Sequence, residues 1–251
     1  DRSGGADLQH VVCFDEYQEA SYIIDQIPQD IITILETLGN NKHSGYIVGG
    51  AIRDLLMGII PKEFDIASSA TSNQIESLFN NTIPVGKAFG TIIVTINQTS
   101  TEITTFRKES NYTDARHPET VIFTNTISDD LHRRDFTINA MAANPLTDEF
   151  IDIFNGIEHL NKGIISCVGE PKTRFQEDTL RAFRCFRFAS QLNFQIEEKT
   201  LNALSILSKI NKGSCPFPLL FTPVTPWNLL LFTLEKIPNG LLILVVIVII
   251  I

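Results

Sequence analysis

The sequence contains few cysteines and histidines, and none of them is arranged as a binding motif. The four cysteines among 251 residues are scattered without a close pair, so the sequence predicts neither a disulfide framework nor a zinc site. The five histidines show no ligand spacing either. Because disulfide-rich chains belong to oxidising compartments, we expect a reducing, cytoplasmic location.

Positive charge is also scarce. The net charge is -9, so the chain as a whole does not attract a polyanion, and any contact with nucleic acid needs a local basic face. The chain begins at Asp1 without a basic segment followed by a short apolar run, and we expect no targeting signal at this end. A membrane is not an expected partner.

A long apolar run occurs at the C-terminal end. Leu241–Ile251 comprises eleven apolar residues, whereas a spanning helix needs roughly 20. Pro238, Lys236 and Glu235 interrupt its extension. A membrane anchor is therefore the lesser interpretation, and we favour a natural continuation that has been replaced, for instance by a shifted reading frame. We expect 211–251 to be an atypical hydrophobic tail.

The remaining chain alternates strand-like and helix-like segments, which predicts an α+β fold. Apolar spacing predicts a helix around Ile31–Leu38 that stops at Gly39 and Asn40. GYIVGG reads as a strand and a turn, FDIA as a strand, and GTIIVTI and TEITTF as alternating strands. SNQIESLF reads as a helix, with Ser72 and Glu76 near its capping positions. TINAMA is expected to be helical, as is the chain from Pro171.

The stretch KEFDIASSA places two carboxylates on one face of a predicted strand. Glu63 and Asp65 would project together, while Phe64 and Ile66 point into the core. Such like charges repel unless a cation lies between them, and Mg²⁺ prefers oxygen ligands of this kind. An ordinary surface pair is the alternative.

A third carboxylate, Glu102, lies in a strand that can pair beside FDIA. Three carboxylates on neighbouring strands can hold two Mg²⁺ roughly 3.5–4 Å apart, a site that serves attack by a 3′-hydroxyl on a nucleotide α-phosphate. Upstream, Gly49 and Gly50 form a turn whose backbone N–H groups can approach a phosphate. Taken singly, a solvated strand residue and a common Gly-Gly turn are the alternatives.

Seven motifs resemble those of class II tRNA nucleotidyltransferases and bacterial poly(A) polymerases. They are GGAIRDLLMG, EFDIASSAT, GKAFGTI, EITTFRKESNYTDARHPETVIF, DDLHRRDFTINAMA, FIDIFNGIEHLNKG and FQEDTLRAFRCFRFA, between about Ile31 and Ala203. Members of this family add C, C and A to tRNA 3′ ends, or polyadenylate RNA, without a nucleic-acid template. The FGT form and the RKESNYTDARHP loop resemble the CCA-adding branch.

The resemblance implies a fold and a division of the chain. We expect a polymerase-β-like nucleotidyltransferase head, with a mixed sheet and helices, over residues 22–165. A helical neck with a nucleotide-recognition motif would follow over residues 166–210. Nothing after Asn211 resembles the family's body and tail domains.

The resemblance also assigns site residues. Glu63, Asp65 and Glu102 would be catalytic and hold the metal. The residues expected to bind nucleotide are Gly49, Gly50, Arg53, Arg133, Arg134, Asp135, Asn139, Asp178, Arg181 and Arg184. Within HRRDF, two guanidiniums can clamp a triphosphate and a carboxylate can accept from a ribose hydroxyl. Asp114 and Arg116 would belong to a mobile loop, with an exposed ion pair as the alternative.

The neck motif QEDTLRAFRCFRFA would select the base. Asp178 and Arg181 are expected to share one helix face, with Phe183 and Phe186 on the opposite, core-facing side. Cytosine and adenine both present an amino donor beside a ring-nitrogen acceptor, which suit a carboxylate and an arginine. Uracil and guanine present the reverse order. A salt-bridged amphipathic helix is the alternative.

Two departures from the family pattern are notable, because Glu63 stands where Asp is usual and Ser166 where Arg is usual. We expect a magnesium-dependent enzyme with tRNA 3′ ends, CTP and ATP as partners. One alternative is a poly(A) polymerase or A-adding enzyme. The other is an inactive remnant that binds nucleotide weakly. The sequence predicts no oligomeric state.

Overall fold

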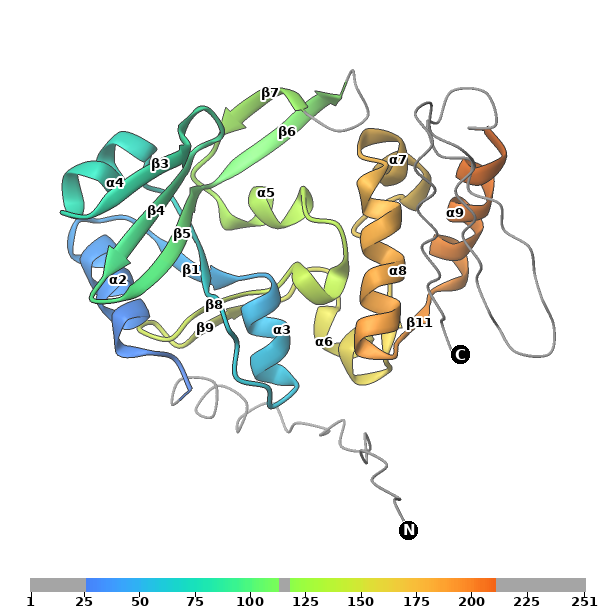
Figure 1. The fold of residues 1–251 in the computed structure, drawn as a ribbon, viewed down its shortest axis with the longest axis horizontal. Coiled ribbons are helices and arrows are strands. Elements are labelled where there is room, and N and C mark those ends of the chain that lie inside the picture. Colours follow the sequence, from blue (N-terminus) through green and yellow to red (C-terminus); the bar gives the residue numbers. More distant parts are fainter. Residues whose placement is uncertain (1–25, 113–117, 211–251) are drawn as a thin grey trace, which may run out of the picture.

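A mixed seven-stranded sheet forms the centre of the protein (Figure 1). The computed structural model describes residues 26–112 and 118–210. In spatial order the strands are β3 (Thr82–Gly86), β4 (Thr91–Ile96), β5 (Thr99–Thr105), β2 (Asp65–Ser68), β1 (Gly45–Val48), β8 (Ala142–Asn144) and β9 (Glu149–Ile151). β2 and β5 pair in parallel, and the other neighbours in this sheet pair antiparallel.

Helices surround the sheet and continue beyond it (Figure 1). Those preceding residue 165 are α2 (Gln29–Asn40), α3 (Gly50–Leu56), α4 (Ser72–Leu78), α5 (Ile127–His132) and α6 (Gly156–Asn161), with the 3₁₀ turns η1 (Lys87–Phe89) and η2 (Thr137–Asn139). α7 (Pro171–Glu177), α8 (Leu180–Leu192) and α9 (Glu198–Ile210) form a group beside the sheet domain. The α+β class expected from the sequence is confirmed.

Two short pairings complete the architecture. β6 (Arg107–Tyr112) and β7 (Pro118–Phe123) form an antiparallel hairpin above α5 (Figure 1). β10 (Ile164–Ile165) pairs in parallel with β11 (Gln195–Ile196) and so connects the helical group to the chain that precedes it.

Both faces of the central strands are buried, because successive side chains point to opposite sides. Ile47 and Ile66 belong to the larger core, which also contains residues of α2 and α3. Val48 and Ala67 pack on the other face against Leu131 of α5. A buried strand of this kind presents polar side chains at its ends, where the candidate site begins.

Three local expectations need correction. α2 includes Gly39 and ends at Asn40, two residues before Lys42 takes a positive φ of 64°. α4 is capped by Thr71 and Gln74, rather than by Ser72 and Glu76, in a capping box whose backbone and side-chain hydrogen bonds satisfy each other. TINAMA forms η2 and the start of β8 instead of a helix, because its last residue joins the ladder with β1.

The neck also differs from the expected pattern. α8 begins at Leu180, so Asp178 lies in the bend between α7 and α8 and does not share a helix with Arg181. Phe186 is buried as predicted, whereas Phe183 is 44% exposed. Phe188 is buried instead, because its ring packs edge-to-face on Phe136 with centroids 5.8 Å apart.

One hydrophobic core runs through the described chain from Ile27 to Leu204. The expected boundary between 165 and 166 falls within it, and the division into head and neck stays a prediction. Asp114, Arg116 and residues 211–251 lie outside the described residues. Within the described ranges, no helix is long and apolar enough to cross a membrane.

Candidate active site

Asp65 and Glu102 are opposite each other on adjacent strands. They are partners in the parallel ladder between β2 and β5, and neighbouring strands are roughly 4.8 Å apart. Asp65 shares its face with Ala67, which packs toward α5. Glu63 precedes β2 instead of lying on it as expected, because the strand begins at the Val48–Asp65 pair. Phe64 is buried as predicted.

The surroundings of Asp65 oppose its negative charge. Its side chain reaches solvent, yet the protein around it removes part of its hydration. This desolvation, followed by the charges of Glu102 and Glu63, raises the pKa of Asp65, while Arg134 acts in the opposite direction. A cation near these oxygens would relieve the repulsion.

The carboxylates of Asp65 and Glu102 are suited to binding a metal ion. Two facing carboxylates supply the oxygen donors that a hard divalent cation prefers. Among the residues placed by the structure, no group of three or more His, Cys, Asp or Glu side chains is arranged to hold a metal ion. Asp65 and Glu102 therefore fit a cation as a pair, and the part of Glu63 as a third ligand stays a prediction.

Gly49 brings the backbone close to this pair. It lies between β1 and α3 with φ +74°, a conformation in which an L side chain is strained. A Cβ at this position would lie 3.2 Å from Nη1 of Arg134 and 4.0 Å from Oδ2 of Asp65. The predicted turn thus stands beside both a candidate metal ligand and a guanidinium. Gly50 instead lies next to the guanidinium of Arg53.

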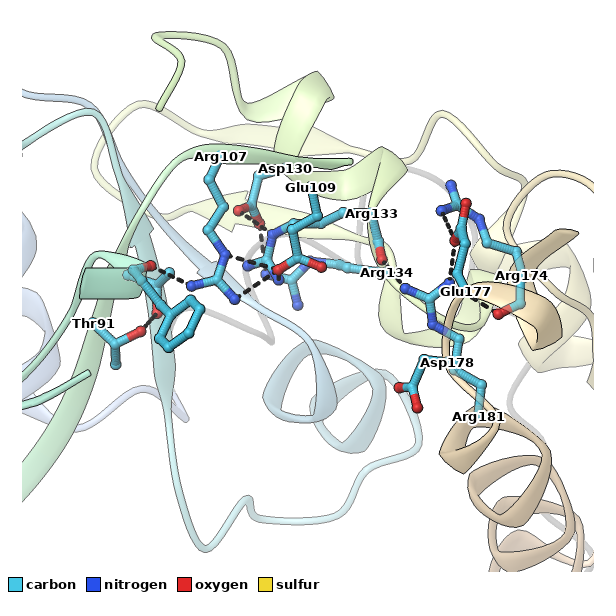
Figure 2. Close-up of polar contacts among 12 residues, drawn as sticks. Thr91, Arg107, Glu109, Asp130, Arg133, Arg134, Arg174, Glu177, Asp178 and Arg181 are labelled. Carbon is cyan, nitrogen blue, oxygen red and sulfur yellow. Dashed lines mark hydrogen bonds and ion pairs between the residues drawn. The ribbon is translucent and has the colours of Figure 1, made fainter. Parts of the chain in front are cut away.

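Arg133 and Arg134 share one buried carboxylate (Figure 2). Asp130 of α5 is 0% exposed, and it accepts from Nε of Arg133 and from Nη2 of Arg134, each at 2.9 Å. Burial acts to raise the pKa of Asp130, but the two guanidiniums outweigh it and hold the pKa below its ordinary value. Asp130 therefore fixes the direction of both arginines.

A second carboxylate connects Arg133 to the β6–β7 hairpin (Figure 2). Glu109 accepts from Nη1 of Arg133 at 3.3 Å and from Nε of Arg107 at 2.9 Å. Arg107 also donates to the carbonyl of Phe89 in η1. Burial and the charge of Arg133 lower the pKa of Arg107. The hairpin and the arginine pair are thus held by one chain of ion pairs.

Arg181, with Asp178 just before it in the chain, reaches the arginine pair despite the distance in sequence. Asp178 and Arg181 are buried, with 8% and 4% exposed. Arg181 donates to Glu177 at 2.8 Å and to the carbonyl of Arg133 at 3.0 Å. Glu177 also pairs with Arg174 (Figure 2). Nη2 of Arg174 donates to the carbonyl of His132. The residues expected to read the base and those expected to hold the triphosphate are therefore neighbours.

Arg53 and Asn139 form a separate contact. Nη1 of Arg53 donates to Oδ1 of Asn139 at 2.9 Å, and Nε donates to Asp54 at 2.9 Å. The Arg53 guanidinium also lies 5.4 Å from the ring centre of Phe188. These contacts join α3 to η2 and to the neck, and the predicted nucleotide contacts of Arg53 and Asn139 stay predictions.

Sequence reasoning missed Asp130, Glu109 and Glu177. The spacing of Asp130 to Arg133 and Arg134, three and four residues, was a usable signal because such pairs face each other on a helix. Glu177 precedes Arg181 by the same four residues. Glu109 offered no comparable signal, since its contact with Arg133 joins a hairpin to a distant helix end.

Residues 45–166 match the family described as the poly(A) polymerase head domain. Residues 45–166 therefore carry this head domain. The matched residues contain β1 to β9 and both candidate metal ligands of the sheet. The arginine pair lies in the head domain, whereas Asp178, Arg181 and Arg184 lie beyond it.

Individual relatives extend the likeness past the head domain. The chain is 46% identical to the CCA-adding enzyme of Leuconostoc mesenteroides, covering 72% of this chain and 46% of that protein. It is 47% identical to a CCA-adding enzyme of Staphylococcus aureus, covering 68% and 42%. The chain thus spans about half the length of these curated relatives.

Solved structures give the same result. The Bacillus stearothermophilus CCA-adding enzyme in complex with CTP matches with TM-score 0.67 and 36% identity, over 72% of this chain and 44% of that one. A tRNA nucleotidyltransferase complexed with a primer tRNA and an incoming ATP analog matches with TM-score 0.59 and 29% identity, over 70% and 50%. The polymerase-β-like head expected from the sequence is confirmed.

Proposed function

We propose that the chain is the catalytic part of a template-independent tRNA nucleotidyltransferase. It adds C and A to the tRNA 3′ end from CTP and ATP and releases pyrophosphate. The observation that carries this proposal is the pairing of Asp65 with Glu102 beside Arg134 and the turn at Gly49. The likeness to CCA-adding enzymes supports it.

The acidic residues are proposed to hold a divalent metal, Mg²⁺ in a two-metal site. CCA-adding nucleotidyltransferases are generally metal-dependent, and the facing carboxylates of Asp65 and Glu102 supply the oxygen ligands that a hard divalent cation prefers. When bound, such metals lower the pKa of an attacking hydroxyl and stabilise the leaving oxygen. Asp65 and Glu102 would hold the cation, and Glu63 would be a further ligand.

The arginine pair is proposed to hold the triphosphate. Arg133 and Arg134 offer planar donors suited to phosphate oxygens, and Asp130 keeps both in place before the nucleotide arrives. Such preorganisation reduces the entropy lost on binding. Asp135, next in the chain, is proposed to accept a hydrogen bond from the ribose.

The neck is proposed to select the base. Asp178 accepts from the amino group shared by cytosine and adenine, while Arg181 donates to the ring nitrogen. Glu177 and the carbonyl of Arg133 hold the Arg181 guanidinium in a fixed direction. Uracil and guanine would leave both buried groups facing like partners, which costs about 1–3 kcal/mol for each unpaired group.

An assay separates this function from its alternatives. The chain is supplied with tRNA that lacks its terminal CCA and with labelled CTP and ATP. Incorporation of CTP followed by ATP supports the proposal, incorporation of ATP alone supports an A-adding enzyme or poly(A) polymerase, and no product supports an inactive remnant. Asp65→Ala, which removes one candidate metal ligand, is the control for contaminating activity.

The division of the chain into head and neck and its cellular location belong to the same proposal. Head and neck are assigned to residues 22–165 and 166–210, with the arginine pair at their contact. A cytoplasmic location is consistent with Cys167 and Cys185, which are buried free thiols, and with a tRNA substrate.

A further inference from the structure

Arg184 contacts two carboxylates that come from different parts of the fold. Its Nε lies 2.9 Å from Oδ2 of Asp135, the residue that follows the arginine pair. Its Nη2 lies 2.8 Å from Oδ2 of Asp178, in the bend before α8. One guanidinium therefore spans the two acidic residues that the proposed function assigns to the sugar and to the base.

The second oxygen of each carboxylate is bound by the backbone. Oδ1 of Asp135 accepts from the N–H of Phe136 at 2.8 Å. Oδ1 of Asp178 accepts from the N–H of Leu180 at 2.9 Å. The other oxygen of Asp178 accepts a hydrogen bond from Arg184, and the other oxygen of Asp135 is held by the ion pair with Arg184. Each carboxylate oxygen keeps a second lone pair that can accept from a nucleotide.

The electrostatics also depend on Arg184. The side chains of Asp135 and Asp178 are 15% and 11% exposed, so solvent screens their charges weakly. Among the described residues, no other Lys or Arg forms an ion pair with either of them. Without Arg184, two negative charges would face each other across the width of one side chain, and like charges at that separation repel.

From these contacts we infer that Arg184 is a positioning residue that couples recognition of the sugar to recognition of the base. It fixes Asp135 and Asp178 relative to each other instead of contacting the nucleotide. The inference rests on the proposed function, because it takes Asp135 as the acceptor from the ribose and Asp178 as the acceptor from the base. Loss of Arg184 therefore loosens both acceptors together.

The first experiment measures binding of CTP, UTP, 2′-deoxy-CTP and inorganic tripolyphosphate to the full chain by calorimetry. For Arg184→Met, the preference for CTP over UTP and the preference for CTP over 2′-deoxy-CTP are both expected to fall about tenfold. A fall of this size corresponds to the loss of about one charge-assisted hydrogen bond between each acceptor and the nucleotide. Tripolyphosphate binding is expected to stay within twofold. Equal weakening of all four ligands would overturn the inference, because Arg184 would then contact the phosphates directly.

Arg187→Met is the matched control. Arg187 lies one turn further along α8, and its guanidinium lies 4.7 Å from the ring centre of Phe188. The substitution removes the same charge from the same helix. Both preferences are expected to stay within twofold of the parent, so a loss as large as that of Arg184→Met would show a general charge effect and overturn the inference.

A second experiment tests the bridge without any nucleotide. Asp135→Asn and Asp178→Asn are each made in the parent and in the Arg184→Met chain, and melting temperatures are compared. Each Asn substitution should lower the melting temperature of the parent, whereas without Arg184 it should leave the melting temperature unchanged or raise it, because the ion pair is already lost and the repulsion between the two carboxylates is relieved. Equal shifts in both backgrounds would overturn the bridge. Intact coupling in a parent that shows no preference for CTP would contradict the proposed function alone.

Discussion

Glu63 differs from Asp65 and Glu102 because it lies outside the sheet and carries one more methylene than the Asp usual in the family. Mg²⁺ tolerates little deviation from octahedral geometry, and a misplacement of about 1 Å can cost a hundredfold in rate. Glu63→Asp is therefore expected to raise turnover, measured as CTP incorporation per enzyme. Unchanged or lower turnover, with Asp65→Ala inactive, would show that Glu63 is a working ligand.

Asp65 carries a second testable property, its raised pKa. A carboxyl whose folded pKa lies above its unfolded value contributes stability that is fully present below the unfolded pKa and is lost as pH rises through the folded pKa. Asp65→Asn is thus expected to raise the melting temperature at pH 8 more than at pH 4, while abolishing nucleotide addition. Asp148→Asn, on an exposed turn, is the control. An equal gain at both pH values would contradict the assignment.

The pKa of Asp130 is shifted in the opposite direction to that of Asp65. Its lowered pKa contributes stability that is present above the unfolded pKa and is lost as pH falls through the folded pKa. Asp130→Asn is expected to destabilise the fold by about 3 kcal/mol at pH 7, the range for breaking a buried ion pair. The variant should also lose less stability than the parent on acidification. Urea titrations at pH 7 and pH 3 measure both effects.

A neighbouring residue provides the control for Asp130. Asp129 pairs with Lys108 and accepts from Thr124 and Thr126, and its side chain is 25% exposed. Asp129→Asn removes the same charge from α5 and should cost under about 1 kcal/mol, as partly exposed pairs do. Equal losses in both variants would show that the buried position of Asp130 is unimportant.

The side chain of Glu109 connects the β6–β7 hairpin to the arginine pair. Glu109→Gln removes the charge that holds both Arg107 and Arg133, so hydrogen exchange of the β6 amides is expected to accelerate and triphosphate binding to weaken. Lys108→Gln removes a 55% exposed partner on the same strand and should change neither. Unaltered exchange in Glu109→Gln would show that backbone pairing alone holds the hairpin.

The elements with strong periodicity were predictable from the sequence. β4 and β5 followed from alternation, β1 and β2 were expected as strands, and burial of Phe64 and Ile66 was expected from their shared face. Gly49 marked the turn before α3 because only glycine suits its positive φ. TINAMA was not predictable locally, since β1 supplies the ladder partners that make its end a strand. Phe188 is buried and Phe183 is exposed because Phe136, far away in sequence, provides the surface on which Phe188 packs.

The candidate site was also predictable from the sequence only in part. The family resemblance indicated the acidic residues, the arginine pair and the neck residues as candidates, and the ladder places Asp65 opposite Glu102. The contacts that orient these groups were not visible, because Glu109 and Arg184 each reach a partner on another element. Spacing within one helix can be read from sequence, whereas a side chain that bridges two elements depends on the completed fold.

For the entire described chain, the structure predicts one cooperative unit. Phe188 packs on Phe136 and beneath the guanidinium of Arg53, so it joins the neck to the sheet domain. Phe188→Ala is expected to cost about 3–5 kcal/mol and to shift the melts of both regions together, measured by hydrogen exchange of β1 and α8 amides. Separate transitions, with β1 unaffected, would show that head and neck fold independently.

The parallel pairing of β2 with β5 has a consequence for the order of folding. β4 and β5 are joined by a two-residue turn at Asn97 and Gln98, so they can meet early, since local contacts close small loops. Asp65 meets Glu102 only after the whole crossover, from Ser69 to Gln98, has returned the chain to β2. The two candidate metal ligands therefore meet later than β4 and β5 do, and a nascent chain carries both before they can act together.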